Sequence, residues 1–156
     1  MMNLESFRAL IAGLTAQIRG RELNQSLQDW LNTEHGPQSQ LFSSLSEACQ
    51  VGAEQGWLCD REAAGIRFGR VFKPADDLSG FSVDVVDMCD VVGPHHEHPG
   101  GEIDLIMPVD AQAQFDGHDA GWLVYGPDSA HRPTVSSGRA FVLYLLPAGQ
   151  ITFTGN

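Results

Sequence analysis

Hydrophobic positions in the first third of the chain repeat every three or four residues, the spacing of one buried helical face. This pattern predicts a helix over residues 4–19, which Gly20 ends. A second helix precedes the His-Gly-Pro stretch at 35–37. A third covers about 38–54 and ends at Gly56. The first part of the chain is therefore predicted to be helical.

After about residue 60 the pattern changes to short runs rich in β-branched and aromatic residues, separated by clusters of Gly, Pro, Asp and Ser. The runs occupy residues 66–72, 81–89, 102–109, 112–115, 122–125, 140–146 and 151–154. Short strands with no helix between them are typical of an antiparallel sandwich or barrel. We therefore expect a mainly β protein, with a helical cap in residues 1–60 and a β-barrel of seven or more strands in residues 61–156, within one compact domain.

The charge balance narrows the choice of partner. The 156-residue chain carries 20 Asp and Glu against nine Lys and Arg, a net charge of −11. Such a surface repels phosphate backbones and anionic lipid, so we expect neither nucleic acid nor a membrane as a partner. The acidity itself does not identify a substrate.

The three cysteines, at positions 49, 59 and 89, form no CxxC pair, which is typical of a reducing compartment. We expect three small buried thiols. No run of 18 apolar residues occurs, and the N-terminal segment lacks the pattern of a signal peptide. The sequence thus predicts a cytoplasmic protein.

The stretch GPHHEHPGGE at 93–102 places three of the six histidines within four positions. One interpretation is a polar loop tip, and the other is half of a metal site. On a strand, His96 and His98 point to the same face, and the turn at 99–101 can bring Glu102 back beside them. A register one residue different would turn His95 inward instead of His96.

A fourth ligand should come from another strand, and His131 in the stretch YGPDSAHRP is the candidate. The pattern His96-x-His98-x3-Glu102, followed by Pro127-x3-His131, resembles the two metal motifs of the cupin superfamily. The resemblance covers about residues 65–155 and implies a double-stranded jelly-roll barrel with these four ligands inside it. Asp90 and Val109 stand where the first motif has glycines, and the second motif is one residue short.

Imidazole and carboxylate ligands together suit a first-row divalent metal such as Fe, Mn, Zn, Ni or Co. The sequence has no nucleotide-binding fingerprint, and we expect no organic cofactor. His35 and His118 lie at a helix end and in a hairpin turn, and we assign neither a metal role.

Neighbours of the predicted metal site follow from strand alternation. Asp104 should face inward with Glu102, where it is a candidate substrate contact. Tyr125 and Tyr144 lie on predicted strands as candidate general acids, although core tyrosines are common. Arg67 and Arg70 are three residues apart, so at most one faces the interior and can bind a substrate carboxylate. We expect Arg132 to point away from the site.

A narrower resemblance rests on overall size, layout and the run PHHEHPGGEIDLIMP. In these respects the chain is similar to the bacterial 4-hydroxylaminobenzoate lyases of nitrobenzoate degradation. The resemblance implies conversion of an aryl hydroxylamine to protocatechuate and ammonia, with the metal as a Lewis acid and an arginine holding the substrate carboxylate. Our candidate catalytic residues are Glu102, Tyr125 and Tyr144. A cupin dioxygenase and a non-catalytic sensor are the alternatives. Cupin-like barrels often pair, so we also expect a homodimer.

Overall fold

The computed structural model describes residues 2–154, and three helices open the chain as predicted. Helix α1 spans Leu4–Ile18, α2 spans Gln25–His35 and α3 spans Gln40–Gln55. Each helix has an N-cap residue whose side chain accepts a hydrogen bond from a backbone N–H of the first turn. These residues are Asn3 for α1, Asn24 for α2 and Ser39 for α3. Gly56 ends α3 in the left-handed conformation, which glycine adopts without strain.

Ten strands and one short 3₁₀ helix, η1 at Asp76–Leu78, follow the helices. The strands are β1 (Arg61–Ala63), β2 (Ile66–Phe72), β3 (Phe81–Val92), β4 (His96–His98), β5 (Glu102–Pro108), β6 (Gln114–Phe115), β7 (Gly121–Tyr125), β8 (Ser129–His131), β9 (Thr134–Pro147) and β10 (Thr152–Phe153). Strands β3 and β9 are longer than predicted. Strands β1 and β8 were not predicted, because three mostly exposed residues carry no clear alternation of polar and apolar positions.

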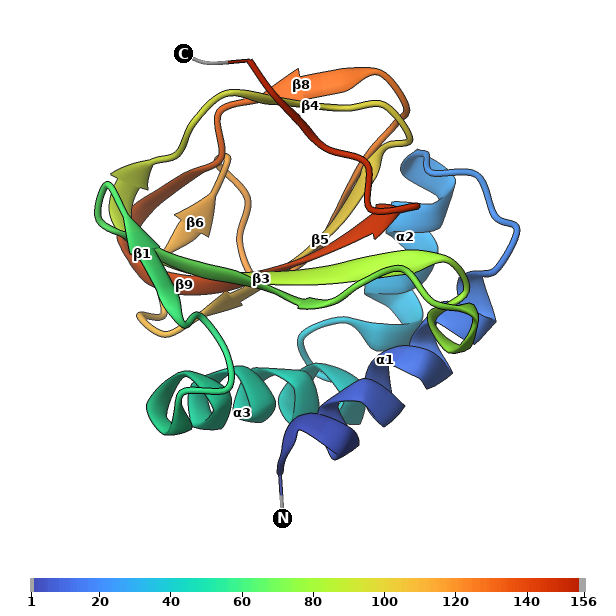
Figure 1. Cartoon of the computed structure of the whole chain (residues 1–156), viewed down its shortest axis with the longest axis horizontal. Coiled ribbons are helices and arrows are strands. Elements are labelled where there is room, and N and C mark those ends of the chain that lie inside the picture. The colour runs from blue at the N-terminus through green and yellow to red at the C-terminus, as the bar shows by residue number, and fades with distance from the viewer. Residues whose placement is uncertain (1, 155–156) are drawn as a thin grey trace.

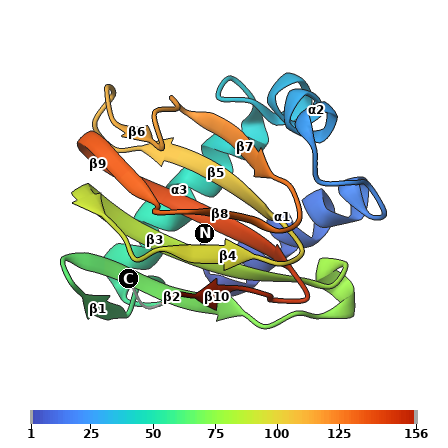
Figure 2. The ribbon, with the colours of Figure 1, turned by 90° about the horizontal axis from the view of Figure 1, so that it is seen from above.

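The strands form two antiparallel sheets. The larger has the order β1-β2-β3-β9-β5-β7, with β6 also paired to β9, and the smaller has the order β10-β4-β8. Figure 1 shows the smaller sheet above one face of the larger, with α1 and α3 below the other face. Seen from above in Figure 2, β8, β4 and β10 lie across the larger sheet. A mainly β, double-sheet jelly roll behind three helices was predicted, and the structure has this architecture.

The central strands of the larger sheet are buried on both faces. Along β5, Ile103, Leu105 and Met107 belong to the hydrophobic core that the helices share. Ile106 belongs to the second core, between the sheets, and alternation places Glu102 and Asp104 on the same side of β5. Since helices and strands bury residues in one shared core, we propose that 1–60 and 61–156 are parts of a single domain.

Helix α2 covers an edge of the larger sheet. Strand β7 lies at the end of the sheet order, so its outer backbone groups have no neighbouring strand. The Asn32 side chain accepts from the Trp122 N–H (2.8 Å) and donates to the Trp122 carbonyl (2.9 Å). Gln28 accepts from the Val124 N–H at 2.9 Å. The helix thus replaces the missing strand and closes this edge.

The prediction of three buried thiols is wrong for one cysteine. Cys49 and Cys59 are buried, but Cys89 is exposed. It precedes Asp90, whose positive φ of 44° accompanies the register shift between β3 and β9. This bulge turns the end of β3 out of the buried layer. Within residues 2–154, no helix is long and apolar enough to cross a membrane.

Candidate metal centre and substrate cavity

The four predicted ligands come together between the two sheets. His96 and His98 lie on β4, Glu102 begins β5 and His131 ends β8, where it pairs directly opposite His96. His96, His98 and Glu102 are almost fully buried. His95 lies on the other side of β4, where its Nδ1 is 2.6 Å from the Thr154 hydroxyl. The strand register therefore directs His96, and not His95, to the interior.

The turn between β4 and β5 returns Glu102 to the histidines. The Gly101 N–H donates to the His98 carbonyl at 3.1 Å, which closes the turn. Gly101 has a φ of 90°, and a Cβ there would lie 2.7 Å from the Tyr125 carbonyl oxygen. Only glycine fits this position.

The ligand atoms of the four residues all lie within 4.8 Å of one another. Glu102 Oε2 is 3.2 Å from His98 Nε2 and 3.4 Å from His131 Nε2, and Oε1 is 3.5 Å from His96 Nε2. The two Nε2 atoms of His96 and His131 are 3.0 Å apart. Atoms about 2.1 Å from a shared ion are separated by roughly 3.0–3.4 Å when their directions differ by 90–110°. The spacing therefore fits one metal ion.

Hydrogen bonds fix the tautomer of His98. The Ser129 hydroxyl donates its only proton to the Gly126 carbonyl (2.6 Å), so its oxygen can only accept from His98 Nδ1 (2.8 Å). His98 Nε2 then carries a bare lone pair. Within residues 2–154, this atom and both carboxylate oxygens of Glu102 are buried without a hydrogen-bond partner. Such burial is costly unless another group satisfies these atoms, and a divalent cation does so.

The electrostatics of the cluster separate two neighbouring carboxyl groups. Burial raises the pKa of Glu102, but the three adjacent imidazoles, those of His131, His96 and His98, outweigh it and hold the pKa well below its usual range. Burial and the charge of Glu102 raise the pKa of Asp104 well above its usual range. Burial lowers the pKa of His131, yet hydrogen bonds with Asp116 and Glu102 raise it overall to about 9. The cluster thus lowers the pKa of one carboxyl group, Glu102, and raises that of its buried neighbour Asp104.

The two candidate tyrosines differ in their surroundings. The Tyr125 hydroxyl donates to Asp116 Oδ2 at 2.5 Å, and burial followed by this hydrogen bond raises the pKa of Tyr125. Tyr144 is buried, and its ring centroid lies 6.4 Å from that of His96. Burial raises its pKa as well. The Tyr125 proton is therefore held by Asp116, whereas Tyr144 lies beside a ligand histidine.

A cavity of about 750 Å³ reaches the cluster at His96 and Tyr144. Its apolar walls include Ile66, Phe68, Val86, Met88, Ile151 and Phe153. Two of the apolar lining residues, Phe153 and Val92, are about 60% exposed, which is unusual for large apolar side chains. The centroid of the Phe153 ring lies 5.6 Å from that of the His96 ring. The cavity therefore offers apolar walls and a polar inner end to a small ligand.

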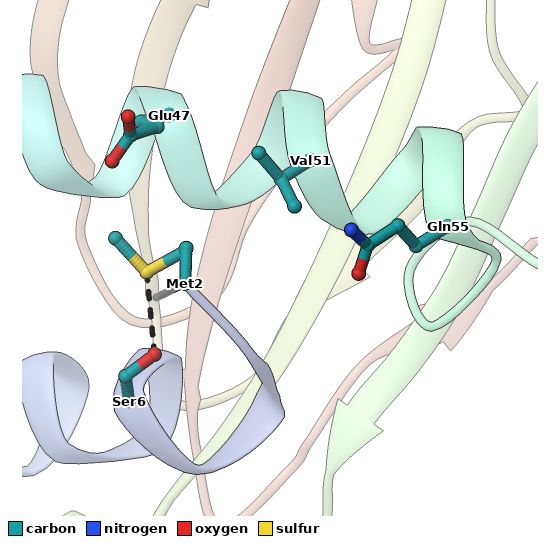
Figure 3. A pocket seen from close by; sticks show the side chains of 5 residues that line it. All are labelled: Met2, Ser6, Glu47, Val51 and Gln55. Carbon is teal, nitrogen blue, oxygen red and sulfur yellow. Dashed lines mark hydrogen bonds between the residues drawn. The ribbon is translucent and has the colours of Figure 1, made fainter.

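A second hollow, of about 510 Å³, lies between the start of α1 and α3. Figure 3 shows the side chains that line it, Met2, Ser6, Glu47, Val51 and Gln55, and the contact between Ser6 and the Met2 sulfur. Its described lining contains neither histidine nor arginine. The cavity between the sheets is thus the candidate site.

Comparison of the sequence with known protein families identifies the family of this chain. The model of the 4-hydroxylaminobenzoate lyase family matches residues 9–153. The chain belongs to this family. Two relatives named 4-hydroxylaminobenzoate lyase are 31% identical, from Nocardioides sp. (strain LMS-CY), and 29% identical, from Pseudomonas putida. The first match covers 88% of this chain and 86% of the relative, and the second 88% of both.

Solved structures similar to this lyase family member include an RmlC-like cupin protein from Ralstonia eutropha. That match has a TM-score of 0.44 and 15% identity, and covers 58% of this chain and 60% of the other. A salicylate 1,2-dioxygenase from Pseudoaminobacter salicylatoxidans matches with a TM-score of 0.45 and 9% identity, over 74% of this chain and 36% of the other.

The arginines of this lyase family member differ in their position relative to the cavity. Arg70 lines the cavity, and Arg67, one of the two candidates, is not among the lining residues. Arg132, which was expected to point away from the site, is exposed and is also among the residues that line the cavity. Strand β8 ends at His131, so the alternation that placed Arg132 outside stops before it.

Two further residues bear on the sequence-based site. Asp104, a candidate substrate contact, is fully buried and is not among the cavity lining. Asp116 was missed, although it contacts both His131 and Tyr125. Its only signal in the sequence is an Asp-Gly turn, which does not reveal what the carboxylate reaches. Of the histidines given no metal role, His35 contacts Gln17 and His118 is exposed.

The cluster predicts metal-dependent stability. Adding Zn²⁺ to the metal-depleted protein at 100 times its Kd should stabilise the fold by about 2.7 kcal/mol, because the ion binds only the folded state. His98→Ala removes a ligand and should lose most of this gain, measured as a shift in Tm by calorimetry. His118→Ala changes an exposed histidine outside the cluster and should keep it. Equal shifts in both variants would contradict a metal site here.

Proposed function

We propose that the protein is a metal-dependent lyase that converts 4-hydroxylaminobenzoate to protocatechuate and ammonia. Membership of the lyase family supports the reaction. The observation that carries the proposal in the structure is a buried His₃Glu cluster at the inner end of an apolar cavity with arginine on its wall. A flat aromatic ring with a carboxylate at one end and a hydroxylamine at the other suits such a cavity.

The overall reaction balances with one water and no external oxidant. The N–O and C–N bonds break, and two new C–O bonds form at adjacent ring carbons. Nitrogen is reduced by two electrons as it becomes ammonia, and the ring carbon that loses its hydrogen is oxidised by two. The enzyme therefore has to move protons and place water, and it needs no oxygen or organic redox cofactor.

We propose that His96, His98, Glu102 and His131 hold a first-row divalent ion, since imidazoles with one carboxylate suit such ions. When bound, the ion supplies Lewis-acid polarisation of a coordinated oxygen. Fe, Mn, Zn, Ni and Co remain the candidates that this donor set admits. Glu102 is then a ligand whose carboxylate is not free to act as a separate base.

Tyr144 is our candidate proton donor to the departing hydroxylamine oxygen. It lines the cavity beside His96, and the proton of Tyr125 is held by Asp116. A neutral phenol at the site is a useful acid because the hydroxide would otherwise leave as an anion. We therefore propose that Tyr125 helps to hold Asp116 in place and does not act as a general acid.

Arg70 is our candidate for binding the substrate carboxylate. Its Nε and Nη2 atoms donate to Asp84 at 2.9 and 3.3 Å, and Nη2 also donates to the Gly149 carbonyl. These hydrogen bonds fix the plane of the guanidinium of Arg70, which lines the cavity. Arg61 and Arg132 also line this cavity and add two further positive charges to it.

We also propose that the lyase works in the cytoplasm of nitrobenzoate-degrading cells, as a homodimer. Free cysteines among the described residues support a reducing compartment. Light scattering at micromolar protein measures the assembly, and a monomer would contradict the dimer.

The reaction is tested by incubating metal-loaded protein with 4-hydroxylaminobenzoate without oxygen. Protocatechuate and ammonia should appear in equal amounts, because the balance consumes only water. Chromatography and an ammonia assay measure both products. Oxygen uptake with a catechol, and no anaerobic turnover, would indicate a dioxygenase. Tight binding of the substrate without turnover would indicate a sensor.

Tyr144→Phe should lower kcat by about 100-fold or more, the usual contribution of a general acid. Tyr144 lines the cavity and no hydrogen bond of its hydroxyl is found within residues 2–154, so the loss of this hydroxyl should change stability little. Tyr125→Phe removes a hydroxyl of the same kind on the far side of His131, and we expect at most about a tenfold loss. Steady-state kinetics compares the two variants. A larger loss in Tyr125→Phe would reverse our assignment.

Arg70→Lys should raise KM by roughly 10- to 100-fold, because a charge-assisted hydrogen bond contributes about 1.5–3 kcal/mol and lysine lacks the guanidinium fork. Arg67→Lys is the matched control, since Arg67 lies on the same strand and does not line the cavity. Its KM should stay within about twofold of wild type. Similar KM values in both variants would remove Arg70 from the substrate site.

A further inference from the structure

We infer that Asp116 is a positioning residue that sets which nitrogen of His131 faces the cluster. The inference rests on the metal site proposed above. Asp116 follows β6 at the Asp-Gly turn, with φ values of 50° for Asp116 and 79° for Gly117. The backbone N–H groups of Phe115 and His118 each donate to the other's carbonyl at 2.9 Å, which closes a two-residue hairpin. The turn therefore fixes the backbone from which the carboxylate projects.

The carboxylate accepts hydrogen bonds from three different segments. Oδ2 lies 2.5 Å from His131 Nδ1 and 2.5 Å from the Tyr125 hydroxyl, and Oδ1 accepts from the Thr134 N–H at 2.9 Å. These partners come from β8, β7 and the start of β9. Asp116 thus connects the segments that surround His131.

These contacts decide the tautomer of His131. An ionised carboxylate can only accept, so His131 must carry its proton on Nδ1. Both oxygens of Asp116 already act as acceptors, Oδ2 from the Tyr125 hydroxyl and Oδ1 from the Thr134 N–H, which is how a carboxylate behaves. When the ring is neutral, its lone pair is therefore on Nε2, the nitrogen that faces His96 and Glu102. This is the nitrogen that a metal ion requires.

The three histidines are supported in different ways. His98 donates from Nδ1 to a neutral hydroxyl, that of Ser129. His131 donates to a carboxylate, whose negative charge makes Nε2 a more basic ligand. His96 Nδ1 is buried without a hydrogen-bond partner within residues 2–154. Asp116 therefore gives one of the three imidazoles a support that the others lack.

Turn geometry alone does not require a carboxylate here. Asparagine adopts the left-handed conformation as readily as aspartate, and it is equally favoured before glycine in such a turn. The choice of aspartate is explained instead by its contacts with His131 and Tyr125. Asp116→Asn therefore changes the hydrogen bonds to His131 and Tyr125 and should keep the conformation of the turn.

In Asp116→Asn the amide oxygen can keep the hydrogen bond from the Thr134 N–H, which places the NH₂ group against His131 Nδ1. Because that NH₂ donates, His131 would shift its proton to Nε2 and lose its ligand lone pair. We expect the Kd for Zn²⁺ to rise about 10- to 100-fold, the usual cost of losing such a supporting group. Competition with a chromophoric chelator measures it.

Asp90→Asn is the matched control. Asp90 also has a positive φ and also accepts a backbone N–H, that of Gly138, but it does not contact the histidines. Its Zn²⁺ affinity should equal that of wild type. Wild-type affinity in Asp116→Asn would overturn the inference, and so would an equal loss in Asp90→Asn.

Nuclear magnetic resonance of the Zn²⁺-loaded wild type gives a second readout that no folding defect can obscure. A proton on His131 Nδ1, assigned by its absence in His131→Gln, is expected at low field. Finding His131 protonated on Nε2, or finding no Zn²⁺ binding in wild type, would overturn the inference. Neither readout uses turnover, so failure on 4-hydroxylaminobenzoate would reject the proposed substrate and leave Asp116 in its role.

Discussion

Burying three imidazoles and a carboxylate around one point is the constraint on which the rest of this structure depends. Their lone pairs converge between two sheets, away from water, and such groups are costly to bury without a partner. The convergence needs His96 opposite His131 in the smaller sheet and a turn at Gly101 that returns Glu102 to them. A shift of one residue in the pairing of β4 with β8, or in the length of the turn at Gly101, would separate these four side chains.

The architecture around the cluster follows from what β5 has to do on its two faces. One face carries Glu102 and Asp104 toward the smaller sheet, and the other carries apolar residues that water must not reach. Helices α1 and α3 cover that apolar face, and α2 satisfies the edge strand β7 through Asn32 and Gln28. The helices thus hold rigid the strands that position the ligands, without touching the cluster themselves.

The cluster has two sides with different chemistry. Toward the cavity it presents His96, with Tyr144 beside it, and the arginines lie further along the same wall. On the other side, His131 is hydrogen-bonded to Asp116, which also accepts a hydrogen bond from the Tyr125 hydroxyl. In the proposed lyase, the first side meets substrate and the second keeps the ligands in place. Two tyrosines that look alike in the sequence are thereby given different tasks.

The sequence alone determined the features that depend on local periodicity and on short spacings. Helical spacing predicted the three helices, and the period of two predicted that His96 and His98 share a face with Glu102 beyond the turn. What only the tertiary structure decided are contacts between segments far apart in the chain. The Asp116 carboxylate reaches His131 and Tyr125, Arg70 pairs with Asp84 at the cavity, and Arg132 lies on the same wall. Alternation gives the face of a strand on which a residue lies, but which distant side chain it meets depends on how turns and sheets place the strands in space.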